Sequence, residues 1–372
     1  MSNRFENNSK KTLLIISLIM ILVVLFGFEK LLGNTRFGGE ENQSVRHIRL
    51  KENTPNINKM LSPSDDIVAL SDSLENKPYS FKIDQNGFIF PSTPHRDADK
   101  VIAFIGGSTT ECMYVDEDKR FPALTGQLLE TSNNKKINAL NAGVSGNNSM
   151  HSINTLLNKI IPMNPDIAVL LHNINDLSVL LHEKTYWNNN QHRSLIVEED
   201  HSIKSQIKQL FPNTYTFAYE VKRKLMGDGN EFDNSDDGHN KPKLSNEKML
   251  SMFKANLNSF VEINKANSIT PVLMTQASRF TEKPDDVIMK NLQNLDAMDL
   301  TYSEYRSLFQ AMNQVIRTVA LEKSVLLIDL EKEVPPTNQY MSDPVHFTNS
   351  GSELVAKIIS AKLAPLVEEL LE

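Results

Sequence analysis

Residues 101–105 form an uninterrupted apolar run, and Gly106, Gly107 and Ser108 follow it directly. This feature constrains the fold more than any other, because such a run is typical of a strand buried on both faces of a parallel sheet. The two glycines allow the sharp turn that must come next. Ser108 is then expected at the carboxyl edge of the sheet, where open α/β sheets place their sites. The alternative is that Ser108 only caps the next helix.

The rest of the chain continues this alternation of apolar runs and amphipathic segments. Further strands are expected at residues 137–142, 167–171, 269–275 and 325–329. Helices are expected at residues 121–131, 149–161, 177–183, 246–266, 302–322 and 349–371. Strands that alternate with helices predict an α/β fold, in which a parallel sheet is covered by helices through right-handed crossovers.

Composition excludes several classes of function. The net charge of the 372 residues is −7, and no arginine-rich stripe is present, so a nucleic-acid partner is not expected. The single cysteine, Cys112, excludes an internal disulfide and a multi-cysteine zinc site. No metal-binding or nucleotide-binding motif occurs, so we expect neither a metal nor another cofactor.

Near the N-terminus, residues 12–28 are 17 residues without a charge, which is the short end of a membrane-spanning helix. We expect a single-pass membrane helix at residues 12–32, with a cleaved signal peptide as the competing interpretation. Positive charges precede the segment, so residues 1–11 are expected in the cytoplasm. The rest of the chain is then expected outside the cell membrane, in a periplasmic or extracellular location.

Residues 33–97 are interpreted as a stalk and a lead-in hairpin. A short helix is expected within residues 65–74, and Asn86 and Gly87 predict a tight turn between residues 79 and 90. The main domain is expected at residues 98–372, with an insertion at about 185–246 rich in Asn, Asp, Lys and Gly. We expect a short helix near 217–225 in that insertion and a disordered loop after it. The insertion is either a substrate lid or a solvated variable loop.

Four loops that follow four different strands carry polar residues suited to chemistry. They contain Ser108, residues 141–148, residues 172–176 and residues 343–346. Parallel strands share one carboxyl edge, so residues as distant in sequence as Ser108 and His346 can converge there.

These residue types match nucleophilic catalysis. Serine needs an adjacent base, which His346 can supply, and Asp343 can hold the imidazole in the required tautomer. An acyl-transfer intermediate carries an oxyanion that needs fixed donors. The backbone N–H groups of Ser108 and Gly146 and the side-chain amide of Asn175 are the candidates.

With these blocks in this order, the chain resembles the SGNH (GDSL-like) hydrolase superfamily over residues 101–372. The matching blocks are residues 106–111, 141–146, 174–176 and 343–346. Residues 84–88 also resemble the lead-in of membrane-anchored, envelope-associated members. Each block alone is weakly specific, and their order makes the resemblance specific.

The resemblance implies a flavodoxin-like α/β/α sandwich with a five-stranded parallel sheet. It also implies Ser108 as nucleophile, His346 as base, Asp343 as its orienting partner, and Gly146 and Asn175 as oxyanion donors.

The chain departs from the family pattern at three places. Gly107 stands where many members have Asp, Asn173 stands where the third block usually has Gly, and the insertion at 185–246 is additional. The change at Asn173 concerns how substrate reaches Asn175. The change at Gly107 and the insertion concern which substrate is bound.

Three aromatic or imidazole side chains are candidates for contacts with substrate. Trp187 and Tyr186 open the insertion and are suited to stacking on a sugar, and His172 begins one of the polar loops. Ordinary packing is the alternative for all three. Cys112 is expected to be buried rather than reactive.

We therefore expect a membrane-anchored serine esterase or O-acetyltransferase that acts on ester groups of an envelope carbohydrate. One alternative is a catalytically inactive protein with the same fold that binds carbohydrate or assists assembly. Another is a lipase or thioesterase. Esterase and transferase share the acyl-enzyme step and differ in whether water or a sugar hydroxyl accepts the acyl group.

Overall fold

The computed structural model describes residues 9–33, 46–92, 94–188, 190, 193–198 and 244–371. The chain divides into two compact units. The smaller unit consists of Met1–His47 and Glu198–Phe217, and its described helix is α1 (Ser9–Gly33). Within the described part of the chain, no helix combines the length and the apolar character that crossing a membrane requires.

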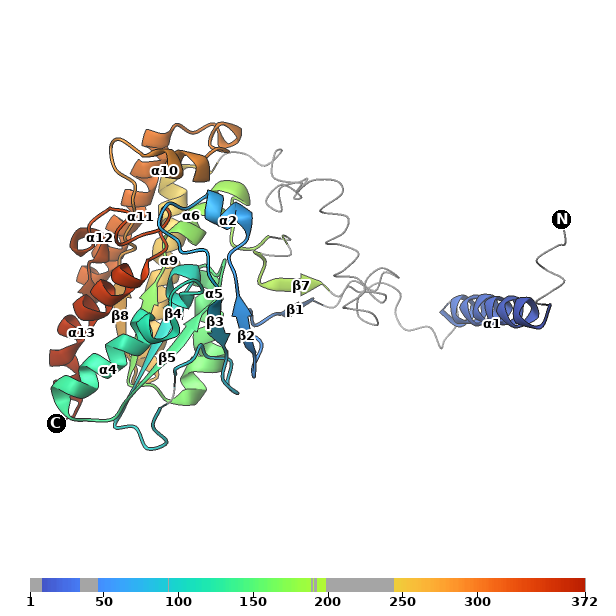
Figure 1. Ribbon diagram of the computed structural model, residues 1–372, viewed down its shortest axis with the longest axis horizontal. Helices are drawn as coiled ribbons and strands as arrows, with labels where there is room; N and C mark the ends of the chain where they lie inside the picture. The colour runs from blue at the N-terminus through green and yellow to red at the C-terminus, as the bar shows by residue number, and fades with distance from the viewer. Residues whose placement is uncertain are drawn as a thin grey trace. The chain divides into compact units, whose positions relative to one another are not determined.

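The larger unit, Ile48–Val197 with Ala218–Glu372, is built around one parallel sheet of five strands (Figure 1). The strands are β4 (Lys100–Gly106), β5 (Ile137–Gly143), β6 (Ile167–Leu171), β8 (Thr270–Met274) and β9 (Leu326–Ile328). Their order is β5-β4-β6-β8-β9, so the strand that leads to Ser108 lies inside the sheet. Each strand lies within two residues of its predicted position, and the predicted α/β fold with a five-stranded parallel sheet is confirmed.

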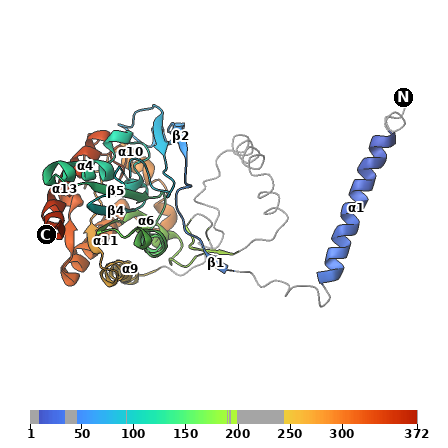
Figure 2. The same ribbon diagram turned by 90° about the horizontal axis from the view of Figure 1, so that it is seen from below.

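Side chains alternate between two buried layers along these strands, as the two-residue period of a strand requires. On β4, Ala103 and Ile105 face one apolar cluster and Ile102 and Phe104 face the other. The first cluster is formed with α5 (Ser149–Thr155), α6 (Ile174–His182), α9 (Asn246–Ala266) and α11 (Tyr302–Lys323). The second is formed with α4 (Phe121–Asn133), α12 (Leu330–Glu333) and α13 (Asn349–Leu371). Figure 2 shows the two sets of helices on opposite sides of the sheet.

Two predicted helices differ from the observed ones, one in its helix type and the other in its first residue. The helix expected at 149–161 is α-helical only to Thr155 and continues as a π turn and a 3₁₀ turn at Ile161–Met163. Pro162 lies in that last turn, where its missing N–H does not cost a helical hydrogen bond. Helix α6 begins at Ile174 instead of 177, so Asn175 lies in its first turn.

Residues 48–92 pack against the sheet, although the sequence predicts a stalk and a lead-in hairpin at residues 33–97. Lys159 forms an ion pair with Glu52 at 2.7 Å, and the Asn53 side-chain amide donates to Gly143 O at 3.0 Å. Both guanidinium Nη atoms of Arg279 contact the Asp72 carboxylate at 2.7 Å. These contacts bring the segment that contains Arg49 and Lys51 to the carboxyl edge of the sheet.

The lead-in segment forms a small antiparallel sheet of β2 (Asn58–Leu61) and β3 (Tyr79–Lys82). The first arm of the predicted hairpin, β3, also pairs with β2, which precedes it in the chain. The tight turn at Asn86 and Gly87 is present: Ile83 bridges Ile89, and the Asp84 carboxylate accepts the Asn86 N–H at 2.8 Å. The short helix expected within 65–74 is α2 (Asp65–Ala69).

The remaining described elements are short. They are β1 (Arg46–Ile48), α3 (Ser108–Glu111), β7 (Ile196–Glu198), α10 (Asp286–Asn291) and 3₁₀ turns at Glu117–Lys119 and Asp296–Met298. The helix and loop predicted within the insertion, near 217–225 and beyond, lie outside the described residues.

Candidate active site

Ser108 is held at the carboxyl end of β4 by a sharp turn through Gly106 and Gly107. It is the first residue of α3, which has only four residues and ends at Cys112 in the left-handed conformation (φ 56°). Gly107, rather than Ser108, is the N-cap of this helix. The Ser108 hydroxyl instead lies 2.7 Å from His346 Nε2, so the capping interpretation does not describe this serine.

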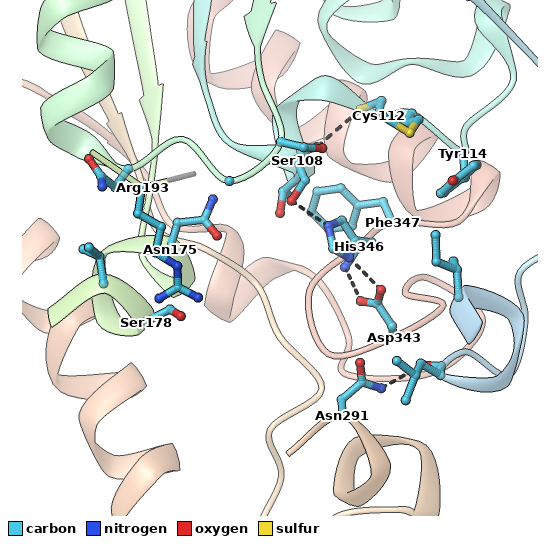
Figure 3. A pocket seen from close by; sticks show the side chains of 18 of the residues that line it. Ser108, Cys112, Tyr114, Asn175, Ser178, Arg193, Asn291, Asp343, His346 and Phe347 are labelled. Atoms are coloured by element: carbon cyan, nitrogen blue, oxygen red, sulfur yellow. Dashed lines mark hydrogen bonds and ion pairs between the residues drawn. The ribbon is translucent and has the colours of Figure 1, made fainter. Parts of the chain in front are cut away.

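His346 and Asp343 come from the loop before α13 and meet Ser108 across 238 positions of sequence. The other ring nitrogen, His346 Nδ1, lies 2.6 Å from Asp343 Oδ2 (Figure 3). Asp343 Oδ1 accepts the backbone N–H groups of Val345 and His346 at 2.9 and 2.8 Å. The carboxylate therefore fixes both its own loop and the imidazole that faces Ser108.

The charges at this site favour a basic imidazole. Burial lowers the pKa of His346, but the charge of Asp343, its hydrogen bond and the charge of Glu111 outweigh burial, so the pKa lies above its ordinary value of 6.5. Burial alone raises the pKa of Asp343, and the His346 contacts and backbone donors bring it below its ordinary value. Asp343 therefore stays ionised, and His346 can accept a proton from Ser108.

Glu111 is a second carboxylate beside Ser108 that sequence reasoning did not single out. Its side chain is buried, and it accepts a hydrogen bond from the Ser145 hydroxyl. Burial raises the pKa of Glu111, while the Ser145 hydrogen bonds and the charges of His346 and Lys51 oppose that rise. The signal was present in the sequence, because Glu111 lies three residues after the candidate nucleophile, about one helical turn away.

Asn175 lies near Ser108 because residue 107 has no side chain. A Cβ atom on Gly107 would overlap the Asn175 amide nitrogen and would lie 3.1 Å from Asn147 O. Asn175 Nδ2 donates to Asn147 O at 2.7 Å, and a side-chain amide has two N–H donors, so one remains to face the site. The departure at Gly107 thus makes room for a donor.

Gln276, in the loop after β8, connects two other loops of the site by hydrogen bonds. This role of Gln276 is not predicted from the sequence. Its Nε2 donates to Thr109 Oγ1 at 2.9 Å, and its Oε1 accepts the Ile174 N–H at 2.9 Å. One buried side chain thus links the residue after Ser108 to the residue before Asn175. The second departure has a structural role too, because Asn173 is buried and its Nδ2 donates to Phe309 O at 2.9 Å.

The loops that carry Ser108, Gly146, Asn175 and His346 open on one cavity of about 890 Å³. The predicted residues that line it are Ser108, Gly146, Asn175, Asp343 and His346. The volume falls in the range of small-molecule sites. Among the described residues, no group of three or more His, Cys, Asp or Glu side chains is arranged to hold a metal ion.

The structure does not bring the three substrate-contact candidates to this cavity. Tyr186 is buried, and its hydroxyl donates to Asp176 at 2.7 Å. His172 is buried and pairs with the Ser152 hydroxyl at 2.6 Å, and Trp187 is exposed outside the cavity lining. Packing is therefore the better description of Tyr186 and His172, because their polar atoms bond within the core. Cys112 is buried as expected, and burial raises its pKa to about 12.

Comparison with known proteins gives one sequence match and several structural likenesses. The profile of the GDSL-like lipase/acylhydrolase family matches residues 104–354. No curated protein matches the chain in sequence.

Two of the similar solved structures are a lipase/acylhydrolase from Enterococcus faecalis and an acetylxylan esterase from Geobacillus stearothermophilus. The first is 15% identical and has a TM-score of 0.43, with 72% of this chain and 96% of that chain covered. The second is 16% identical and has a TM-score of 0.42, with 72% and 94% covered. At these values the likenesses carry no conclusion about substrate.

The charge arrangement predicts how His346 titrates. In the intact protein, the ring signals of His346 should shift with a midpoint above pH 6.5, as measured by NMR. In Asp343→Asn the raising charge is lost while burial remains, so the midpoint should fall below that of the intact protein. His172 is an internal control for protonation, because burial lowers its pKa to about 3 and its ring should stay neutral between pH 5 and 8. A His346 midpoint below 6.5 would contradict the arrangement.

Proposed function

The chain belongs to the GDSL-like lipase/acylhydrolase family, and we propose that it is a serine esterase whose nucleophile is Ser108. One observation carries this proposal: a continuous hydrogen-bonded series runs from Asp343 through His346 to the Ser108 hydroxyl, with distances of 2.6 and 2.7 Å. The series opens on the cavity, where the His346 side chain is 41% exposed. An ester carbonyl placed there reaches the nucleophile and its base together.

In the acylation step, the Ser108 oxygen attacks the ester carbonyl carbon while its proton passes to His346 Nε2. The C–O bond to the alcohol then breaks, and His346 returns the proton to the leaving alcohol oxygen. Asp343 stabilises the imidazolium that exists between these two transfers. The products of this step are a Ser108 acyl ester and the free alcohol.

In the second step an acceptor hydroxyl attacks the acyl-enzyme with His346 again as base. Water as acceptor releases the carboxylic acid, and a sugar hydroxyl yields a new ester. We assign water as the acceptor because the family is one of hydrolases. An ester group on a carbohydrate is the proposed substrate, and it is supported by polar side chains in the cavity lining that suit sugar hydroxyls, namely Asn148, Asn190 and Ser194.

The oxyanion that forms in both steps requires donors that are already in place. The proposed donors are the N–H groups of Ser108 and Gly146 and one N–H of the Asn175 amide. Asn147 O holds that amide in position at 2.7 Å. Because the site is preorganised by such contacts, no reorganisation is needed as charge develops.

The nucleophile assignment predicts that Ser108→Ala lowers kcat/KM for p-nitrophenyl acetate by roughly a thousandfold or more, because no other group replaces the attacking oxygen. Release of p-nitrophenol by a shortened chain that begins at Asn34 measures this. Ser360→Ala is the matched control, since Ser360 lies on α13 and bonds to Lys357 O at 3.1 Å. Equal rates for Ser108→Ala and the intact enzyme would refute the assignment.

The space at residue 107 predicts a second kinetic effect. In Gly107→Ala the new methyl group displaces the Asn175 amide, so kcat should fall by about 10²–10³, the usual loss for one oxyanion donor. A double-mutant cycle isolates the cause, because Gly107→Ala should cost little more once Asn175 is already Ala. Additive losses in the cycle would show that residue 107 acts by another route.

We also propose that residues 12–32 anchor the enzyme in the cell membrane and that the enzyme acts outside it. The support is the sequence alone: 17 uncharged residues with positive charges before them. The full chain should then sediment with membranes after salt washing, and the chain beginning at Asn34 should stay in the supernatant. Recovery of the full chain in the supernatant would overturn the anchor.

A further inference from the structure

One side of the active-site cavity carries an excess of positive charge that the proposed ester chemistry does not use. Arg49, Lys51 and Arg193 all line the cavity together with Ser108. Among the described residues of the lining, Asp343 is the one carboxylate, and it is bonded to His346. This local excess runs against the net charge of the whole chain, which is −7. Charge of one sign in a concave site concentrates ligands of the other sign.

Lys51 stands next to the proposed oxyanion donors. Its Nζ lies 3.1 Å from the position that a Cβ atom on Gly146 would occupy. Burial, with smaller contributions from the charges of Arg49 and Arg193, lowers the pKa of Lys51 to about 8 against the opposing charge of Glu111. Arg49 and Arg193 are therefore both close enough to act on Lys51, which still carries its charge at neutral pH.

Two carboxylates act on this group from behind the cavity wall. Glu111 is buried and acts on Lys51, and Glu183 is buried and acts on Arg193. Neither belongs to the cavity lining, and Glu183 also accepts a hydrogen bond from the Asn190 amide at 2.8 Å. A ligand in the cavity thus meets the cations first, with the carboxylates supporting them.

Arg193 and two aromatic residues of the cavity lining lie on different sides of the nucleophile. Figure 3 shows Arg193 on the same side as Asn175, whereas Tyr114 and Phe347 lie on the other side of Ser108. A substrate whose carbonyl oxygen points to Asn175 therefore extends one of its substituents toward the cations.

We propose that the substrate of this cavity is an acylated sugar that carries an anionic group, a carboxylate or a phosphate, close to the ester. Arg193 and Lys51 bind the anionic group, and Arg49 adds to the positive electrostatic potential at the opening of the cavity. This inference rests on the proposed esterase function and specifies its substrate class.

The test compares substrates that differ only in charge. Acetate release from an O-acetylated methyl glucuronide is measured beside the corresponding uncharged glucuronamide, and an O-acetylated glucose 6-phosphate distinguishes phosphate from carboxylate. We expect kcat/KM for one of the anionic esters to exceed that for the amide by about tenfold or more, and to fall with added salt. Equal kcat/KM values for all three esters would overturn the proposal.

Variants assign the effect to residues. In Arg193→Gln and Lys51→Gln, the ratio of anionic to uncharged kcat/KM should fall by about tenfold. Lys254→Gln is the matched control, because Lys254 lies on α9, pairs with Glu322 at 2.8 Å and should leave the ratio as it is. If Lys51→Gln instead lowers kcat equally on all three esters, Lys51 acts on the oxyanion and its assignment to the anion is overturned.

Binding separates failure of this inference from failure of the esterase function. Calorimetry with Ser108→Ala measures affinity without turnover, and the acetylated glucuronide or sugar phosphate should bind about tenfold more tightly than the amide. Equal affinities would refute the anion site. Charge-selective binding without hydrolysis by the intact enzyme would uphold the anion site and refute the esterase function.

Discussion

The close approach of α3 to the carboxyl edge of the sheet is the constraint on which the site depends. A Cβ atom on Gly143, at the end of β5, would overlap the backbone nitrogen of Glu111, so the short helix lies directly against the strand. This contact buries Glu111 and places its carboxylate within reach of the Ser145 hydroxyl. It also fixes the direction in which Ser108 leaves the turn, toward His346 at 2.7 Å.

Several hydrogen bonds between loops hold the rest of the site in place around that contact. Gln276 joins Thr109 to Ile174, Asp343 binds both the imidazole and two N–H groups of its own loop, and Asn147 O holds the Asn175 amide. Each partner comes from a loop after a different strand. Such supporting hydrogen bonds hold reactive groups in position before substrate binds, which is the condition for electrostatic catalysis.

The same burial that orders the site also sets its charges. The carboxylates of Asp343 and Glu111 both favour the protonated form of His346. Lys51, close to Gly146, has its pKa lowered to about 8 by burial and by neighbouring cations. The cavity therefore combines a strengthened base with a cationic wall, a pairing that suits an ester of an anionic sugar.

The sequence by itself determined the elements and their order. Apolar runs and amphipathic segments located the five strands of the sheet and all of its covering helices except the short α12, because these patterns reflect local burial. Parallel topology then placed Ser108, Asn175, Asp343 and His346 on one edge.

Only the tertiary structure decided that residues 48–77 pack on the domain and that β3 pairs with β2. It also decided that Tyr186 and His172 are core residues, and that Gln276, Lys51 and Arg193 belong to the site. Those contacts join segments that are far apart in the chain. The local spacing of apolar residues does not indicate which distant segment a polar side chain will contact.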